Sequence, residues 1–264
     1  MTSTRAEGAR ARARRETVQA ITDAARTQLG EVGAPALSVR AVTRELGMAA
    51  SSVYRYFPNR DALLTALILD AYRGVAAAAV GAESLLDRAD LLGRWIAVHR
   101  GVRGWALEHP HEYALIYGSP VPGYAAPEDT VGPAAEVALL LAAIAVEAWT
   151  APDRGAEGRS ADRSAEALSS ETRPDQTSLG SDLLADLRGL LDQVLSAVPE
   201  GRRSDLATLR PDRVLAVLDA WTELFGSISF ELFGHYRHVI DARGEHLDAV
   251  ALRTAEAAGV VVRG

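Results

Sequence analysis

The sequence predicts an all-α protein, in which a small N-terminal three-helix domain is joined to a larger helical domain. Apolar residues recur every three or four positions through most of the chain, and no segment alternates like a β-strand. Residues 37–64 contain two short helical patterns around a tight turn. Long apolar segments follow, and 264 residues that are 48% hydrophobic suffice for one large or two medium cores.

The first helix is expected to begin near residue 14 and to carry one apolar stripe. The stripe consists of Val18, Ile21, Ala25 and Leu29. Gly30 and Gly33 break the pattern after it. Residues 1–13 are rich in arginine and have no apolar period, so we expect a flexible basic arm that either lies in a minor groove or hangs free.

Two helices around a turn are expected next. Ser38 suits the N-cap of the first, and Gly47 suits the left-handed residue that ends it. Its inward residues are Val39, Val42 and Leu46. Val53 and Phe57 give the second helix an inward face. The residues expected to point outward are Ala50, Ser51, Tyr54 and Arg55.

A longer helix is expected to brace this pair. Pro58 and Asn59 end the preceding helix, and Asn59 is a suitable cap for the next one. The inner face of the bracing helix consists of Leu63, Leu64, Leu67, Ile68 and Val75.

This segment resembles the N-terminal DNA-binding domain of TetR/AcrR-type transcriptional regulators, and we place that domain at residues 14–74. The resemblance extends without a gap from about Arg14 to Tyr72. The residues that carry it are Arg40, Gly47, the Tyr54-x-Tyr56-Phe57 run and Arg60. It implies a helix-turn-helix whose second helix enters the major groove of DNA.

The resemblance also implies roles for individual residues. Arg40 would read a base edge, because its guanidinium matches O6 and N7 of guanine. Arg60 would hold a phosphate beside a helix N-terminus. Further DNA-binding residues would be Ser38, Ala50, Ser51, Ser52, Tyr54 and Arg55. Ala49 and Ala50 offer no side-chain hydrogen bonds, so thymine methyl groups or DNA shape would contribute to specificity.

Charge is distributed unevenly along the chain. Residues 1–60 hold ten arginines and five acidic residues, so this part carries +5. The whole chain carries −7, which leaves −12 for the other 204 residues. A basic domain on an acidic body is typical of a nucleic-acid reader with a regulatory part. The alternative is a basic tail that is merely solvated.

The larger domain is expected to occupy residues 75–264. Pro110 should kink or break a helix, and residues 131–149 should form an apolar helix that must be buried. Residues from about 150 to 180 are polar and lack a helical period, which predicts a disordered insertion. The remaining helices are expected at residues 182–198, 211–238 and 241–258.

This domain is similar to a TetR subgroup with a Trp-x-x-x-His-Gly signature. Residues 221–226 read WTELFG, so Phe225 replaces the signature histidine. HPHEYALIYGSPVPGYAAP and SISFELFGHY are also similar to that subgroup. The resemblance places the dimer interface in the last two helices, where we expect it to include Trp221, Phe225, Ile228 and Leu232.

Aromatic and polar side chains in the middle of the chain are candidates for a pocket that takes a small hydrophobic or aromatic effector. They are Trp95, His99, Trp105, Tyr113, Tyr117, Tyr124 and Trp149. The alternative is that they only pack the core.

Other chemistry is not expected. The chain has no cysteine and no Gly-rich phosphate loop, nucleophile elbow or zinc-binding His-Glu-x-x-His, and its histidine pairs lack a third ligand, so neither enzyme, metal nor cofactor is expected. No apolar run approaches the length of about 20 residues that a membrane span needs, which predicts no such span.

The expected protein is a homodimeric repressor in the bacterial cytoplasm, associated with the nucleoid, which an effector releases from a palindromic operator. Two alternatives remain open. One is a helical ligand-binding or enzymatic protein with a vestigial DNA-binding domain. The other is a DNA-binding regulator without a small-molecule ligand.

Overall fold

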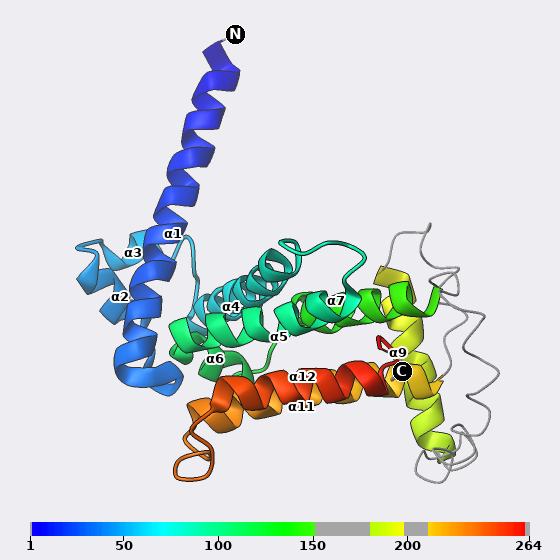
Figure 1. The fold of residues 1–264 in the computed structure, drawn as a ribbon. Helices are drawn as coiled ribbons and strands as arrows, with labels where there is room; N and C mark the ends of the chain where they lie inside the picture. The colour runs from blue at the N-terminus through cyan, green and yellow to red at the C-terminus, as the bar shows by residue number, and fades with distance from the viewer. Residues whose placement is uncertain (1, 151–179, 198–210, 262–264) are drawn as a thin grey trace, which may run out of the picture. The chain divides into compact units, whose positions relative to one another are not determined.

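The computed structural model describes residues 2–150, 180–197 and 211–261 (Figure 1). These residues form helices and turns without a β-strand, which confirms the all-α class. The helices are α1 Thr2–Ala36, α2 Val39–Glu45, α3 Ala50–Val53, α4 Arg60–Glu83, α5 Leu91–Glu108, α6 Pro110–Tyr117, the 3₁₀ helix η1 Glu128–Thr130, α7 Val131–Thr150, α9 Ser181–Ala197, α11 Pro211–Leu232 and α12 Arg243–Ala257.

A first compact unit comprises Met1–Ala78, Val102–Glu136 and Leu232–Gly234. Its core joins the predicted inner faces of the first four helices. The buried residues include Ile21, Ala25, Leu29, Val42, Val53, Phe57, Leu63, Leu64, Leu67 and Ile68. Burial of one such side chain contributes about 1.5–3 kcal/mol. Because α2 and α3 are too short to be stable alone, this cluster is what holds them in place.

Two turn residues behave as the sequence predicts. Gly47 ends α2 with a φ of 61°, in the left-handed region that favours glycine. Asn59 caps α4, because its Oδ1 accepts a 2.8 Å hydrogen bond from the N–H of Ala62. Ser38 occupies the N-cap of α2, but its side chain makes no capping bond. Its N–H instead donates to Oε1 of Gln28 at 2.7 Å.

The N-terminal residues differ from the expected flexible arm. α1 begins at Thr2, so the segment before residue 14 is helical and extends beyond the helices that α1 packs against in its own unit (Figure 1). Alanine, arginine and glutamate all have high helix propensity. Arg12 also donates to Glu16 one turn later, at 2.8 Å. Local propensity therefore outweighs the absence of an apolar stripe.

Pro110 separates two helices, as predicted. α5 ends at Glu108 and Pro110 is the first residue of α6, where a proline costs no helical hydrogen bond. α6 contributes Leu115 to the core of the first unit. In the loop that follows, the hydroxyl of Tyr124 lies 2.9 Å from Oγ1 of Thr65 on α4.

A second compact unit comprises Ala79–Gly101, Val137–Glu231 and His235–Gly264. Its buried residues include Trp95, Val98, Leu141, Ile144, Val217, Ala220, Leu224, Ile228, Val250 and Ala251. The indole N–H of Trp95 donates to Oγ1 of Thr254 at 3.2 Å, which satisfies the one polar atom of this buried ring.

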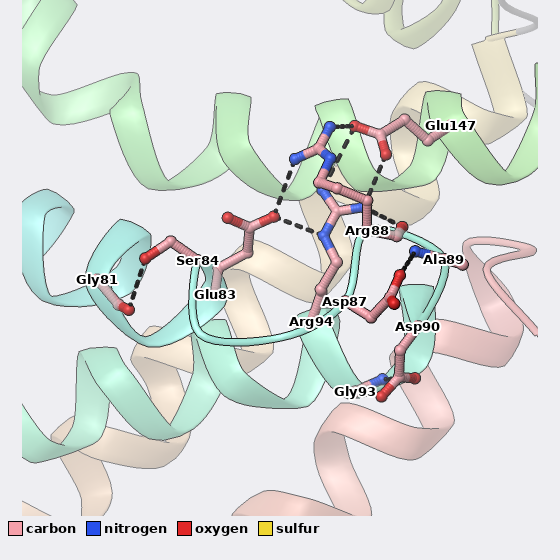
Figure 2. Close-up of polar contacts among 10 residues, drawn as sticks. All are labelled: Gly81, Glu83, Ser84, Asp87, Arg88, Ala89, Asp90, Gly93, Arg94 and Glu147. Atoms are coloured by element: carbon pink, nitrogen blue, oxygen red, sulfur yellow. Dashed lines mark hydrogen bonds and ion pairs between the residues drawn. The ribbon is translucent and has the colours of Figure 1, made fainter.

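An arginine is buried among acidic partners in the second unit (Figure 2). Arg94 on α5 is 1% exposed, and its Nε donates to Oε1 of Glu83 at 2.5 Å. Its Nη1 donates to Oε2 of Glu147 at 2.7 Å. Arg88 also pairs with both carboxylates. The cluster joins the end of α4 to α5 and α7, and it compensates a charge whose burial alone would be very costly.

α7 is less buried than predicted. Val137, Leu141, Ile144 and Ala145 are buried, whereas Val131 is 63% exposed.

The expectation that the chain has no apolar segment long enough to span a membrane was wrong. α4 and Glu128–Trp149 are long and apolar enough to cross a membrane by length and composition alone, with 44% and 22% of their most apolar windows buried. Core helices of soluble proteins pass the same test, so these two helices are weak evidence for a membrane.

The C-terminal helices follow the predicted order. α11 begins at Pro211 as expected, but it ends at Leu232 and not near His238. Gly234 and His238 adopt φ values of 82° and 65° in the turn that follows, and such values end a right-handed helix. The predicted insertion falls on residues 151–179, which lie outside the described residues.

Candidate functional site

Arg40 lies on the outer side of α2. Its neighbours Val39 and Val42 are 5% and 0% exposed, because they pack into the core of the first unit. Arg40 itself is exposed, and among the described residues its guanidinium has no hydrogen bond or ion pair. The core therefore fixes the backbone while the side chain remains available to a partner.

α3 is a single turn that Val53 anchors in the core. Ser51 is exposed and Ser52 is half-buried. In the turn after α3, Tyr54 is 40% exposed and Arg55 is exposed. The structure thus places polar side chains outward from α3 and its following turn, as the sequence predicted. Ala50 is the first residue of α3.

Arg60, which the resemblance implies as a phosphate ligand, makes hydrogen bonds within its own unit. Its Nη2 donates to the carbonyl of Ala34 at 2.7 Å and its Nε to the carbonyl of Leu37 at 3.2 Å. These carbonyls lie at the end of α1 and in the turn before α2, where helix geometry leaves acceptors without partners. Arg60 thus ties the start of α4 to the α1–α2 turn, and its phosphate contact stays a prediction.

We expect Arg60→Met to lower the free energy of unfolding by about 1–2 kcal/mol. The change removes charged hydrogen bonds from carbonyls that are only partly exposed. Chemical denaturation would measure the loss, and Arg55→Met would be the control because Arg55 is exposed. Unchanged stability with weakened DNA binding would contradict the structural role and favour the phosphate contact.

Comparison with known proteins identifies the family. Residues 95–253 match the model "Tetracyclin repressor-like, C-terminal domain", and residues 21–67 match "Bacterial regulatory proteins, tetR family". The first match alone spans more than half of the chain. The chain belongs to the TetR family. It is therefore a transcriptional regulator with a helix-turn-helix DNA-binding domain, and not an enzyme.

Relatives agree with this TetR assignment. The chain is 36% identical over 239 residues to the HTH-type transcriptional regulators Mb1846 of Mycobacterium bovis and Rv1816 of Mycobacterium tuberculosis H37Rv, with 87% of this chain and 86% of each relative covered. A crystal structure of a protein described as regulatory, SCO4313, is 29% identical, with a TM-score of 0.61 over 93% of this chain and 98% of that one. A Rhodococcus sp. RHA1 protein of unknown function, 17% identical, shares the fold with a TM-score of 0.54 over 92% of this chain and 93% of that one.

The aromatic residues expected to bind a ligand fall into both compact units of this TetR regulator. Those in the first unit are Trp105, Tyr113, Tyr117 and Tyr124, and those in the second are Trp95, His99 and Trp149. Several have their polar atom satisfied by the fold. Besides Trp95 and Tyr124, the indole N–H of Trp149 donates to the carbonyl of Ala258 at 2.7 Å. Packing therefore explains these three without a ligand.

His99 is different. Its ring is fully buried, and Nδ1 lies 2.9 Å from the carbonyl of Trp95, so Nδ1 carries the proton. Nε2 is then an acceptor, and no described residue donates to it. Burial lowers the pKa of His99 to about 4, although the hydrogen bond to Trp95 and the charges of Asp248 and Glu223 oppose the shift.

We expect the low pKa of His99 to reduce the free energy of unfolding as the pH falls. Because its pKa is about 4 in the folded protein and near 6.5 when unfolded, the unfolded chain takes up a proton first as pH falls below 6.5. Stability should drop by about 2 kcal/mol between pH 7 and pH 5 through this residue. Denaturant titrations at the two pH values should show that His99→Phe lacks this drop. His235→Gln should retain it, because the side chain of His235 is exposed. An unchanged pH dependence in His99→Phe would refute the assignment.

The residues expected at a dimer interface are mostly packed within one chain. Phe225 and Ile228 are 5% and 1% exposed, while Trp221 and Leu232 are half-buried. The large apolar side chains exposed on α11 and α12 are instead Phe230, at 50%, and Leu252, at 45%. Sequence reasoning missed Phe230, although its position two residues after Ile228 puts it on the other side of the helix.

The histidine pairs form no metal site among the described residues. Nδ1 of His109 lies 3.0 Å from Oε1 of Glu112, and no three histidine, cysteine or acidic side chains of the described part of the chain converge. His109, His111 and Glu112 instead line a cleft of about 380 Å³ beside α1, together with Arg26.

Proposed function

We propose that this TetR-family regulator is a homodimeric cytoplasmic repressor that binds a palindromic operator and is released by a small hydrophobic or aromatic effector. The observation that carries the DNA-binding part is the exposed polar face of α2, α3 and the turn after α3, which the buried side chains of Val39, Val42 and Val53 hold in place. Arg40 and Tyr54 project from that face. A single α-helix fits the major groove, and a rigid base makes the contacts of such a helix specific.

Arg40 is the main base reader in this proposal. Its free guanidinium would donate two parallel hydrogen bonds to O6 and N7 of a guanine. Ser51, Ser52 and Tyr54 would bond phosphates or base edges, with Ser38, Ala50 and Arg55 near the backbone. Because the side chains of Ala49 and Ala50 cannot form hydrogen bonds, part of the specificity would come from thymine methyl groups and DNA shape.

A homodimer supplies the two-fold symmetry that a palindrome requires. We place its interface on α11 and α12, the helices on which Phe230 and Leu252 are exposed. Trp221 and Leu232 are half-buried and lie with Phe225 and Ile228 on the opposite side of α11 from Phe230, so their place in the interface stays a prediction. Phe225 and Ile228 would support that surface from the core.

Effector binding is supported by the unpaired acceptor of His99. A buried acceptor without a partner costs about 1–3 kcal/mol, and a ligand hydroxyl or N–H would recover this. Within the first unit, a movement of α6 would reach the reader helices through Arg26 of α1, whose Nε donates to Oε2 of Glu112 on α6 at 2.8 Å. Arg26 also pairs with Asp70 on α4 at 3.6 Å, so α1, α4 and α6 share one group of charges. Effector and operator affinities would then be reciprocally coupled.

The deciding experiment is selection of genomic and random-sequence fragments by the purified full-length protein at near-physiological salt. Enrichment of a short palindrome, together with a dimer mass in light scattering, would support the proposal. A folded protein that enriches no sequence would contradict operator binding in the effector-free state.

The alternative of a regulator without a small-molecule ligand is tested separately. Organic extracts of the purified protein and a library of apolar compounds would be assayed for a rise in the melting temperature. A compound that raises it and releases the selected palindrome would support the effector. A compound that stabilises the protein without changing operator affinity would contradict coupling.

A further inference from the structure

The core-facing stripe of α1 continues beyond the core as arginines. Ile21 is fully buried and Val18 is half-buried. One helical turn before Val18 is Arg14, and one turn earlier is Arg10, and both are exposed. Because residues three and four apart share a helix face, these two arginines lie on the side of α1 that packs against the reader helices farther along.

A contact with the turn after α3 shows where this face points. The guanidinium carbon of Arg14 lies 5.1 Å from the centre of the Tyr56 ring. Tyr56 directly follows Tyr54 and Arg55, which are exposed in the turn after α3. The arginine face of α1 therefore borders the surface proposed to read DNA.

On the other side of the same turns, Arg12 is paired with a carboxylate. Arg12 pairs with Glu16 at 2.8 Å, and their side chains are 77% and 64% exposed. Arg10 has no such partner among the described residues, and Arg14 contacts only an uncharged ring there. Two positive charges thus lie unpaired among the described residues on the side of α1 that contacts the turn after α3, and their chemistry suits a row of phosphates.

We propose that Arg10 and Arg14 form a second contact line on DNA, in which the helical extension of α1 binds phosphates beside the site read by α2 and α3. The proposal rests on the proposed DNA-binding function. It goes beyond the shared family domain, because the family model matches residues 21–67 and leaves both arginines outside. The contact adds affinity and orientation, and no base preference.

The test compares Arg10→Gln with Arg12→Gln in the full-length protein. Each variant removes one positive charge from neighbouring turns, and glutamine retains helix propensity. Binding to a duplex selected from random DNA and to an unrelated duplex of equal length would be measured from 0.05 to 0.3 M salt. Arg10→Gln should weaken both complexes roughly eightfold per protomer at 0.1 M salt. It should also lower the magnitude of the slope of log affinity against log salt concentration by about 0.9 per protomer. Arg12→Gln should change both by less than twofold.

Two results would overturn the inference alone. Equal losses in the two variants would mean that only the overall charge matters, and wild-type affinity in Arg10→Gln would mean that this face touches no phosphate. Circular dichroism would establish that both variants keep the helix. If the wild-type protein bound neither duplex, the proposed function would fail and this inference with it.

Discussion

Arg40→Ala should lose most of the discrimination between the operator and random DNA. A bidentate contact between arginine and guanine contributes about 1–3 kcal/mol of discrimination, which corresponds to roughly five- to 150-fold for each half-site. The backbone should be unaffected, because Val39 and Val42 hold α2 from the buried side. Titration of the selected palindrome and of an unrelated duplex at the same salt concentration would measure the change.

The matched control for this result is Arg44→Ala. Arg44 is an exposed arginine on the same helix, one turn from Arg40. Arg44→Ala should lower the affinity for both duplexes by the same small factor, since any contact that Arg44 makes with a phosphate carries no base information. If Arg40→Ala also weakened both duplexes equally, its proposed role as a base reader would be wrong.

Arg94→Met should have the largest effect on stability, a loss of about 3–5 kcal/mol in the free energy of unfolding. Arg94 is 1% exposed, and its removal leaves Glu83, which is itself 6% exposed, with only the more exposed Arg88 as a cationic partner. The second change Glu83→Gln should recover part of the loss, because it removes the uncompensated charge. Urea titrations of the single and double variants would measure both effects.

Arg100→Met provides the comparison on the same helix. Arg100 binds Asp248 through two hydrogen bonds of 2.8 Å, but its side chain is 66% exposed. Exposed ion pairs contribute about 0–1 kcal/mol, so this variant should remain close to the wild type. If Arg94→Met lost as little stability as Arg100→Met, the buried cluster would be replaceable, as some buried ion pairs are.

The DNA-reading domain could be predicted from sequence because its determinants are local. The apolar stripe from Val18 to Leu29 forms one helix face, Gly47 ends a helix and Asn59 caps one. Each of these effects involves residues only a few positions apart, which periodicity and capping rules describe well. The same rules placed Pro110 at a helix boundary and Pro211 at a helix start. They were less successful for residues 1–13, where helix propensity outweighed the missing apolar period.

The roles of the arginines could not be predicted in this way. Arg40 lies on the short helix α2 and Arg60 begins the long helix α4. Arg40 has no hydrogen bond or ion pair among the described residues, whereas Arg60 is bound to carbonyls of α1 and the following turn. Those acceptors lie 23 and 26 residues before Arg60 in sequence. A residue pattern records neither the distance between such groups nor the direction of a side chain.

The sequence by itself therefore determined the helical class, the order of the helices and the reader domain, since these depend on periodicity and on turn chemistry. Only the tertiary structure decided which charges are buried. Arg94 and Arg100 are six positions apart on α5, and one is buried between carboxylates while the other is largely exposed. The reason is that Glu147 reaches Arg94 from 53 residues away in sequence, and solvation depends on such distant neighbours.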